Sequence, residues 1–324
     1  MNHVSFQTVL GFVFLVCLMI TGGCAPKRLP LASIEGVPGH FMQGQIIDMK
    51  TGKTITFAEL INALDSVRLV FVGEVHDNPE HHLIETQILQ ALTARHDTLS
   101  VALEFLTVPR QGAVNQYMKG DLDETAFLDE VEWHKNWSFP YHFYRPLILS
   151  LRENGHPLFA VNAPGPIVKK VARSGLKSLT PEERKQVADH MDLENQAHRE
   201  YLLEVYEAHP QRELKHFEYF YQAQCVWEET MAQEIARRLR KTRGKMVVFA
   251  GNGHIIHHFG IPDRVVRRIP VDMASVLLYP LTEASRMNKN MGDYVWLTSG
   301  CSAGTPMMHP PRPHPARSRE PLQK

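Results

Sequence analysis

The chain has 324 residues and a formal net charge of zero; 44% of its residues are hydrophobic and 22% are charged. These values are ordinary for a soluble globular protein of one large or two medium domains, and the balanced charge gives no reason to expect nucleic acid as a partner. The 18 histidines are many for this length and favour metal or haem chemistry.

The first residues resemble a bacterial lipoprotein signal. An apolar run over Val9–Ile20 has the length of a signal peptide and is followed by Thr21-Gly22-Gly23-Cys24. The pattern predicts a signal peptide over residues 1–23, cleavage before Cys24 and attachment of lipid (palmitate) to its thiol. The alternative is a plain membrane anchor. No Asp follows Cys24, so the resemblance implies the bacterial outer membrane, with the protein facing the periplasm or the surface.

Segments with several prolines and no apolar periodicity flank the predicted domain. Residues 24–43 are expected to form a tether, and residues 301–324 a disordered tail rich in proline and basic residues. The domain between them covers residues 44–300. After cleavage and lipidation only Cys225 and Cys301 remain, too few for a disulfide framework.

Short apolar runs alternate with amphipathic helical patterns along the domain. An almost continuous apolar run is typical of a strand buried on both faces, and apolar residues three or four apart are typical of a helix. Because helices alternate with strands, the fold class is α/β, with a mainly parallel central sheet flanked by helices. The predicted strands cover residues 45–48, 68–73, 98–104, 157–161, 245–250, 271–279 and 294–297, and the predicted helices cover 57–64, 79–92, 109–119, 123–132 and 145–153.

Two stretches between the predicted strands stand out. Thr180-Pro181-Glu182-Glu183 is a strong helix start, and the chain then stays helical to about residue 241 with a break near His209-Pro210. This predicts a long helical hairpin excursion over about 180–241, projecting from the α/β core. The aromatic-rich stretch 133–144 is either a ligand-facing loop or a loop pinned to the core by its rings, and the second interpretation is favoured.

Polar residues follow the four central strands where each strand ends. Glu74 and His76 follow the first, Glu104 the second, Asn162 the third and His254 the fourth. Because the carboxyl ends of parallel strands lie along one edge of a sheet, we expect the two glutamates and two histidines to form one cluster. Such a set suits a divalent metal (Mn, Co, Zn or Fe), or a general acid/base pair without metal. Each residue alone is more often a cap or a structural hydrogen-bonding group.

Several motifs, taken in order, carry a family resemblance. They are Gly73-Glu74-Val75-His76 with Asp77-Asn78-Pro79-Glu80-His81-His82, Ala102-Leu103-Glu104-Phe105, the stretch from Tyr221 to Ala232, and Gly251-Asn252-Gly253-His254 with Gly260-Ile261-Pro262-Asp263-Arg264. Together they resemble the ChaN-type haem-binding lipoproteins, which share a superfamily with the Tiki proteases and the erythromycin esterases. The resemblance covers roughly residues 44–297. The superfamily pattern of paired glutamates and paired Gly-x-x-His motifs falls on Glu74, Glu104, His76 and His254.

The resemblance implies two functions of different classes. In hydrolase members of the superfamily the cluster is catalytic, and in the Tiki relatives it is metal dependent, which implies a metal-dependent hydrolase. In the ChaN-type branch the resemblance implies haem binding and a role in haem and iron uptake. There a tyrosine holds the haem iron, and two haems stack face to face in a homodimer. An outer-membrane haem receptor is then an expected partner. The haem-binding function is favoured, and the two are not exclusive.

No tight motif marks the haem tyrosine in this sequence. By position the candidates lie in the helical excursion: Tyr201 and Tyr206, with His198 close to Tyr201 on the helix. Tyrosinate is a hard oxygen ligand that suits ferric haem, and Arg199 and Arg212 would meet the propionates. The alternative is that either tyrosine only packs the hairpin.

Overall fold

The structure is a computed structural model that describes residues 31–208, 216–282 and 285–300. The predicted signal peptide with Cys24, the break near His209-Pro210 and the predicted tail over 301–324 lie outside the described residues. In the described ranges, no helix has the length and apolar character needed to cross a membrane.

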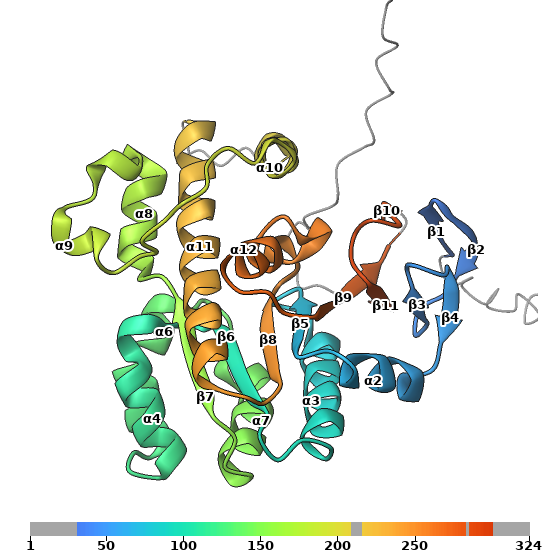
Figure 1. The fold of residues 1–324 in the computed structure, drawn as a ribbon, viewed down its shortest axis with the longest axis horizontal. Coiled ribbons are helices and arrows are strands. Elements are labelled where there is room, and N and C mark those ends of the chain that lie inside the picture. The colour runs from blue at the N-terminus through green and yellow to red at the C-terminus, as the bar shows by residue number, and fades with distance from the viewer. Residues whose placement is uncertain (1–30, 209–215, 283–284, 301–324) are drawn as a thin grey trace, which may run out of the picture. The chain divides into compact units, whose positions relative to one another are not determined.

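An eight-stranded sheet forms the core of the described residues, in the order β4-β3-β11-β9-β5-β8-β6-β7 (Figure 1). The six strands from β11 to β7 pair in parallel, and β3 and β4 add an antiparallel hairpin at one edge. The predicted α/β class with a mainly parallel sheet is therefore confirmed. The strands are β3 (Ile46–Asp48), β4 (Lys53–Ile55), β5 (Leu69–Glu74), β6 (Ser100–Thr107), β7 (Leu158–Asn162), β8 (Met246–Gly251), β9 (Met273–Leu281) and β11 (Tyr294–Ser299).

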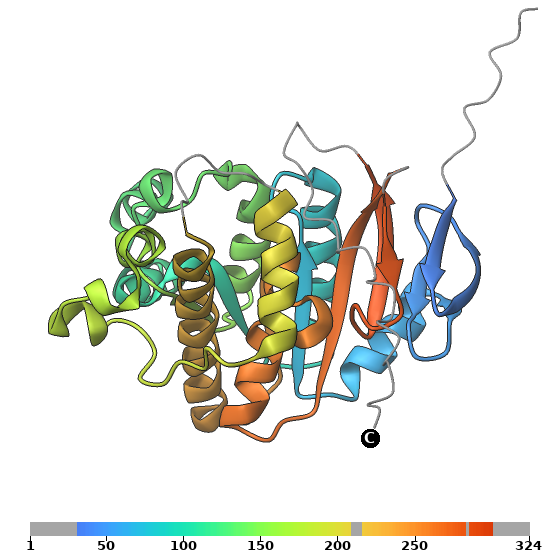
Figure 2. The same ribbon diagram turned by 90° about the horizontal axis from the view of Figure 1, so that it is seen from above.

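Helices cover both faces of the sheet (Figures 1 and 2). Along β5, Val70 and Val72 belong to one core cluster, and Leu69 and Phe71 belong to the other. Fully burying each such side chain stabilises the fold by about 1.5–3 kcal/mol. The Val70 face packs against α2 (Phe57–Asp65), α3 (Pro79–Thr93), α4 (Gln111–Lys119), α5 (Glu124–Glu130), α6 (Trp133–Asn136) and α7 (Tyr141–Glu153). The Leu69 face packs against α10 (Gln196–Ala208), α11 (Phe217–Lys241) and α12 (Ile261–Arg268).

Two of the predicted helices begin with side-chain caps. The hydroxyl of Thr56 accepts from the Glu59 amide while the Glu59 carboxylate accepts from the Thr56 amide, which forms a capping box. Asn78 accepts from the Glu80 amide at 2.9 Å, with Pro79 at the first helical position. Such a cap is worth about 1 kcal/mol. The cap at Asn78 starts α3 directly beyond the end of β5, so the first turns of α3 lie beside that strand end.

The predicted tether is in part regular structure. Residues 32–41 form β1 (Ala32–Glu35) and β2 (Val37–Phe41), which join β10 (Met287–Asn288) in a three-stranded sheet. Side chains of β1 alternate between buried and exposed, so Ala32 and Ile34 reach the core. That alternation, rather than a long periodic pattern, makes the segment a strand, and the prolines at 30 and 38 had obscured it.

The predicted helical excursion is interrupted and does not simply project. Its capping box at Thr180 starts only one turn, α9 (Pro181–Arg184), and α10 begins at residue 196. In between, the side chains of Asp192 and Asn195 accept from the amides two and three residues later, a local bonding that competes with the helix. The longest helix, α11, packs on the sheet through a buried stripe. A further helix, α8 (Gly165–Ser174), was not predicted and packs against α11.

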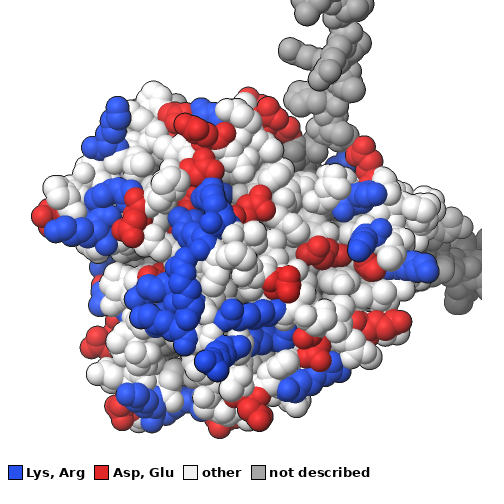
Figure 3. Space-filling view, viewed as in Figure 1, with Lys and Arg blue, Asp and Glu red and all other residues white. Residues whose placement is uncertain are grey.

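Basic side chains gather over α11 on the face shown in Figure 3. The last turn of α11 contains Arg238, Arg240 and Lys241. Cations are favourable at the carboxyl end of a helix because they oppose its macrodipole. Although the net charge of the chain is zero, it therefore has a local basic surface, and the basic residues at the end of α11 are explained by the helix macrodipole.

Candidate functional site

The carboxyl edge of the sheet brings the four predicted cluster residues together. β5 and β8 pair with Glu74 opposite Gly251, and β6 lies on the other side of β8. A Cβ atom at position 251 would lie 2.9 Å from Nε2 of His76 and 3.6 Å from Oε2 of Glu104. His254 follows in the turn η3 (Asn252–His254). Glycine is therefore needed at 251 because His76 and Glu104 approach the same point.

Glu74 is surrounded by donors. Its Oε1 lies 2.6 Å from Nδ1 of His76 and accepts from the Tyr144 hydroxyl at 3.1 Å, and its Oε2 lies 2.9 Å from Nδ1 of His82. Burial alone would raise the pKa of Glu74, but the hydrogen bonds and charges of the two histidines outweigh it and hold the pKa well below its ordinary value. Glu74 is thus ionised, and its charge fixes the orientation of the His76 ring.

A second set of contacts runs from Glu104 to α11. Glu104 accepts from the Gly251 amide at 2.6 Å and lies 3.4 Å from Nε2 of His254, whose Nδ1 lies 3.2 Å from Glu228. Burial alone would lower the pKa of His254, but the two glutamates raise it to about 10. His254 is therefore an imidazolium held between two carboxylates.

Glu228 connects this edge to the helices on the same face. Its Oε2 lies 3.2 Å from Nε2 of His198 on α10 and 3.3 Å from Nη2 of Arg264 on α12. Arg264 also pairs with Glu229 at 3.3 Å, so the buried charges are matched, as burial requires. Burial raises the pKa of the neighbouring Cys225 to about 12, which makes this thiol unreactive.

His82, Glu228 and Glu85, which lies 3.1 Å from Nδ1 of His82, belong to this network but were not among the predicted site residues. Each lies on the buried face of a helix, among apolar neighbours. Their signal in the sequence is a charged or polar residue at a position where the helical spacing requires an apolar one. Glu85, for example, lies three residues before the buried Ile88.

A different set of residues has the close spacing of a metal site. Among the described residues, the group whose ligand atoms all lie within 4.8 Å of one another is Glu74, His82 and Glu85. It shares only Glu74 with the predicted set. The predicted residues instead form two carboxylate–imidazole pairs, Glu74 with His76 and Glu104 with His254. This arrangement is suited to proton transfer.

The aromatic stretch 133–144 both packs the core and borders the cluster. Trp133 and Tyr144 are buried, in line with the favoured interpretation. Trp137 and Phe139 instead contact His76, with ring centroids 4.8 and 5.0 Å from that of the imidazole. The His76 side chain is 24% exposed, the most open of the four predicted cluster residues. Its accessible edge is thus walled by aromatic rings.

The predicted haem residues on the inner face of α10 are enclosed. His198 is fully buried, with one ring nitrogen facing Glu228 and the other 3.3 Å from Nη2 of Arg264. Tyr201 is 4% exposed and packs near the ring of Phe259. Burial and the charge of Glu228 raise the pKa of Tyr201, which opposes the tyrosinate form.

The opposite face of α10 has a different character. Arg199, Leu203 and Tyr206 follow each other at spacings of four and three and so lie along one side of the helix; we call them the α10 face. Leu203 is 37% exposed, and Tyr206 is half-buried with its ring 5.6 Å from that of Phe217. The Arg199 guanidinium lies 5.2 Å from the same ring and pairs with a glutamate on α11. The other predicted propionate partner, residue 212, lies outside the described residues.

The amino-acid sequence matches one protein family and one curated plant protein. The sequence matches the family described as haem-binding uptake, Tiki superfamily, ChaN over residues 60–265. It is 25% identical over 282 residues to the chloroplastic protein RETICULATA-RELATED 5 of Arabidopsis thaliana. That alignment covers 79% of this chain and 37% of the plant protein, so the chain spans little more than a third of this relative.

Two solved structures are similar to the chain, one of them more closely than the other. The ChaN of Campylobacter jejuni, determined with cofacial haem binding, matches with a TM-score of 0.62 and 17% identity over 78% of this chain and 95% of that one. A mutant of the erythromycin esterase EreC in its open conformation matches with a TM-score of 0.46 and 14% identity over 75% and 78% of the two chains. At 17% identity, the likeness to the Campylobacter jejuni structure shows the fold alone. The family match, in contrast, spans the strand-end cluster from β5 to η3, and the chain therefore belongs to the ChaN haem-binding uptake family of the Tiki superfamily.

Proposed function

We propose that the protein binds haem on the α10 face, is held at the outer membrane by lipid on Cys24 and contributes to haem and iron uptake. Membership of the haem-binding uptake family supports haem as the ligand. The observation that carries the site is the α10 face, where a half-buried tyrosine lies beside an exposed leucine and an arginine. Apolar surface suits the porphyrin plane, arginine suits a propionate, and tyrosinate suits ferric iron.

Tyr206 is the assigned iron ligand. Tyr201 is enclosed in the core, and the haem plane cannot reach its hydroxyl without displacing the packing around it. His198 is likewise committed to Glu228. Tyr206 lies at the end of α10 beside the aromatic rings of Phe217 and Phe220, which offer a planar apolar neighbour for the macrocycle.

A haemin titration tests this assignment. Purified full-length protein is titrated with haemin and the absorption spectrum recorded. We expect a saturable Soret shift for the native protein, its loss or a roughly tenfold weaker affinity for Tyr206→Phe, about 1.4 kcal/mol, and no change for the matched variant Tyr201→Phe. Absence of a shift in the native protein contradicts haem binding. A shift that survives in Tyr206→Phe and disappears in Tyr201→Phe assigns the iron to the other tyrosine.

Anchoring and assembly are tested separately. Two copies that meet through their α10 faces would bring their haems together, and the Campylobacter jejuni relative has cofacial haem. We expect the sedimentation coefficient to rise when haemin is added to the native protein and not to the Tyr206→Phe variant.

For the anchor, Cys24→Ser should move the protein from the membrane to the soluble fraction after expression in a bacterium. A variant that stays in the membrane fraction argues for the plain anchor.

A second candidate function is hydrolysis at the cluster of Glu74, His76, Glu104 and His254, and one observation supports it. Glu74 engages Nδ1 of the partly exposed His76, and in the described part of the chain Nε2 of His76 makes no hydrogen bond. A carboxylate that fixes the imidazole tautomer leaves the other nitrogen as a general base, with the imidazolium of His254 nearby as proton donor. An activated ester such as p-nitrophenyl acetate tests it. Activity that His76→Ala leaves unchanged would exclude this role.

A further inference from the structure

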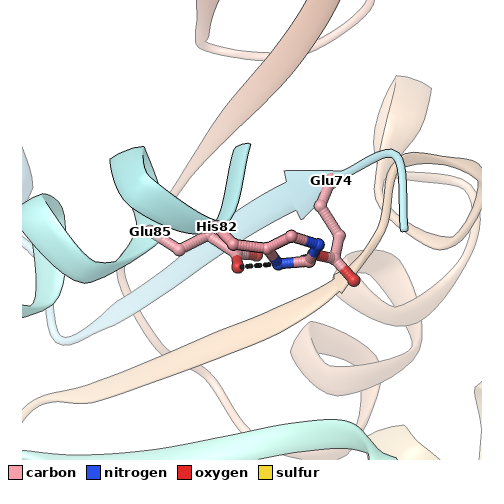
Figure 4. A group of neighbouring side chains, drawn as sticks. All are labelled: Glu74, His82 and Glu85. Carbon is pink, nitrogen blue, oxygen red and sulfur yellow. Dashed lines mark hydrogen bonds and ion pairs between the residues drawn. The ribbon is translucent and has the colours of Figure 1, made fainter. Parts of the chain in front are cut away.

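We propose that Glu74, His82 and Glu85 bind a divalent first-row metal ion in the protein core. Figure 4 shows Glu74 from the end of β5 turned toward His82 and Glu85 from the first turns of α3. The three side chains are 1–4% exposed, and one ligand atom from each lies within 4.8 Å of the others. The proposal goes beyond haem binding, because α3 and α10 cover opposite faces of the sheet.

The His82 ring is oriented as metal-bound histidines are. Its Nε2 lies 3.1 Å from the carbonyl oxygen of His76, and it must donate there because a carbonyl can only accept. A donor bond from the far nitrogen to a backbone carbonyl is the usual support of a metal ligand, since it fixes the tautomer and raises ligand basicity. The near nitrogen, Nδ1, faces Glu74 at 2.9 Å and Glu85 at 3.1 Å.

One oxygen of each carboxylate, Oε2 of Glu74 and Oε2 of Glu85, faces the same nitrogen of His82. Oε1 of Glu74 is occupied by His76 and by the Tyr144 hydroxyl, whereas Oε2 has Nδ1 of His82 as its neighbour at 2.9 Å. In the described part of the chain, Oε1 of Glu85 makes no hydrogen bond. Buried acceptors without a partner are uncommon and costly, and each one calls for an explanation. When the His82 ring is neutral with its proton on Nε2, Nδ1 has no proton to donate, and a cation among the three residues then supplies the partner that the carboxylate oxygens need.

The donor set limits the choice of metal. One imidazole nitrogen and two carboxylates suit Zn²⁺, Mn²⁺, Fe²⁺ or Co²⁺, and two carboxylates next to a neutral imidazole leave two negative charges for a divalent ion to balance. Mg²⁺ and Ca²⁺ prefer shells of several oxygens and water, which this dry position does not offer.

The first experiment measures metal retention by the native protein. Full-length protein is refolded from denaturant with ZnCl₂, MnCl₂ or CoCl₂, because the buried position is open only in the unfolded chain. It is then desalted and analysed for elements. We expect roughly one ion per chain and a Tm that rises on loading and falls again with EDTA, whereas Mg²⁺ and Ca²⁺ have no effect. Retention of less than about a tenth of an ion, with no change in Tm, overturns the proposal and leaves protons as the balancing charge.

Matched variants then locate the ion. Glu85→Gln should lower metal affinity roughly tenfold or more, while Glu104→Gln, at the neighbouring strand end but outside the three residues, should retain metal as the native protein does. The reverse result assigns the metal to the Glu104–His254 pair and overturns the proposal. If Glu85→Gln does not fold, the visible spectrum of the Co²⁺-loaded native protein decides. Intense bands indicate a low-coordinate site with nitrogen, and the weak bands of hydrated Co²⁺ contradict it.

Haem binding does not depend on this site. Failure of the metal experiment with an intact Soret shift rejects the metal site alone, and failure of the haem titration with one retained metal ion rejects the haem proposal alone. The two outcomes are distinguishable because haem iron is detected by its Soret absorption and the core metal by elemental analysis of haem-free protein.

Discussion

The carboxyl edge of the sheet and the α10 face differ in how their side chains are held. At the edge, carboxylates and imidazoles are 2.6 to 3.4 Å apart and are fixed by the register of parallel strands. On the α10 face, the side chains follow helical spacing, Arg199 and Tyr206 lie against the ring of Phe217, and all three are partly open to solvent. The edge is thus a network whose charges are balanced largely by the protein itself, whereas the partner that we propose for the α10 face, haem, would come from outside. Mutations should therefore affect stability at the first and ligand affinity at the second.

The largest effect is expected from removing the carboxylate at the centre of the edge. Glu74→Ala takes away the counter-ion of the buried His82 and the acceptor of the Tyr144 hydroxyl. Breaking a buried pair on one side should lower the free energy of unfolding by about 3–5 kcal/mol. Urea unfolding measures it. As a control, Glu218→Ala on the exposed pair with Arg199 should change stability by less than about 1 kcal/mol. Equal effects of the two variants would remove the distinction between the regions.

The edge should also make stability depend on pH. The pKa of His82 and that of His254 are each raised from 6.5 to about 10 by neighbouring glutamates, against the effect of burial. The folded protein therefore binds more protons than the unfolded chain between these values, and stability falls as pH rises from about 6.5 to 10, by a few kcal/mol. Urea unfolding in EDTA across this range checks the slope. A flat profile contradicts the imidazolium assignment.

The edge was predictable from sequence because strand order and strand ends are local signals. Glu74, His76, Glu104 and His254 each follow an apolar run, and parallel pairing of those runs places them on one edge. The glycine at 251, which allows His76 to approach Glu104, was part of the same motif.

The partners that come from helices were not predictable in the same way. Glu85 and Glu228 interrupt the apolar stripes of α3 and α11, but the spacing of a helix does not tell which strand end its buried face will meet. The two faces of α10 were likewise unresolved, because both Tyr201 and Tyr206 fit a helical pattern. Only the tertiary packing separates them: the enclosed Tyr201 lies near the rings of His257 and Phe259, and the half-buried Tyr206 lies beside rings of α11.

A smaller effect is expected where the two regions meet. Glu228→Gln keeps the shape of the side chain but removes the charge that faces both His254 and His198. Stability should fall by about 1–3 kcal/mol, and the pKa of His254 should fall below its native value. An NMR titration of the imidazole measures this. The neighbouring Glu229→Gln is the control, because Glu229 pairs with arginines and not with His254. In the Glu229→Gln variant the pKa of His254 should be unchanged. A similar fall of this pKa in both variants would indicate a general loosening of α11.

The smallest effect is expected on the α10 face. Arg199 is partly exposed and already pairs with Glu218, so Arg199→Gln should change the free energy of unfolding by less than about 1 kcal/mol. If Arg199 meets a haem propionate, haem affinity should nevertheless fall a few-fold, and the loss should shrink at high salt because the contact is screened. Arg237→Gln, an exposed arginine on α11 paired with Glu234, is the matched control. An Arg199 variant that unfolds easily but binds haem normally would show that this face belongs to the packing of α10 and α11. A stable variant with weakened, salt-sensitive binding would mark it as a surface for haem.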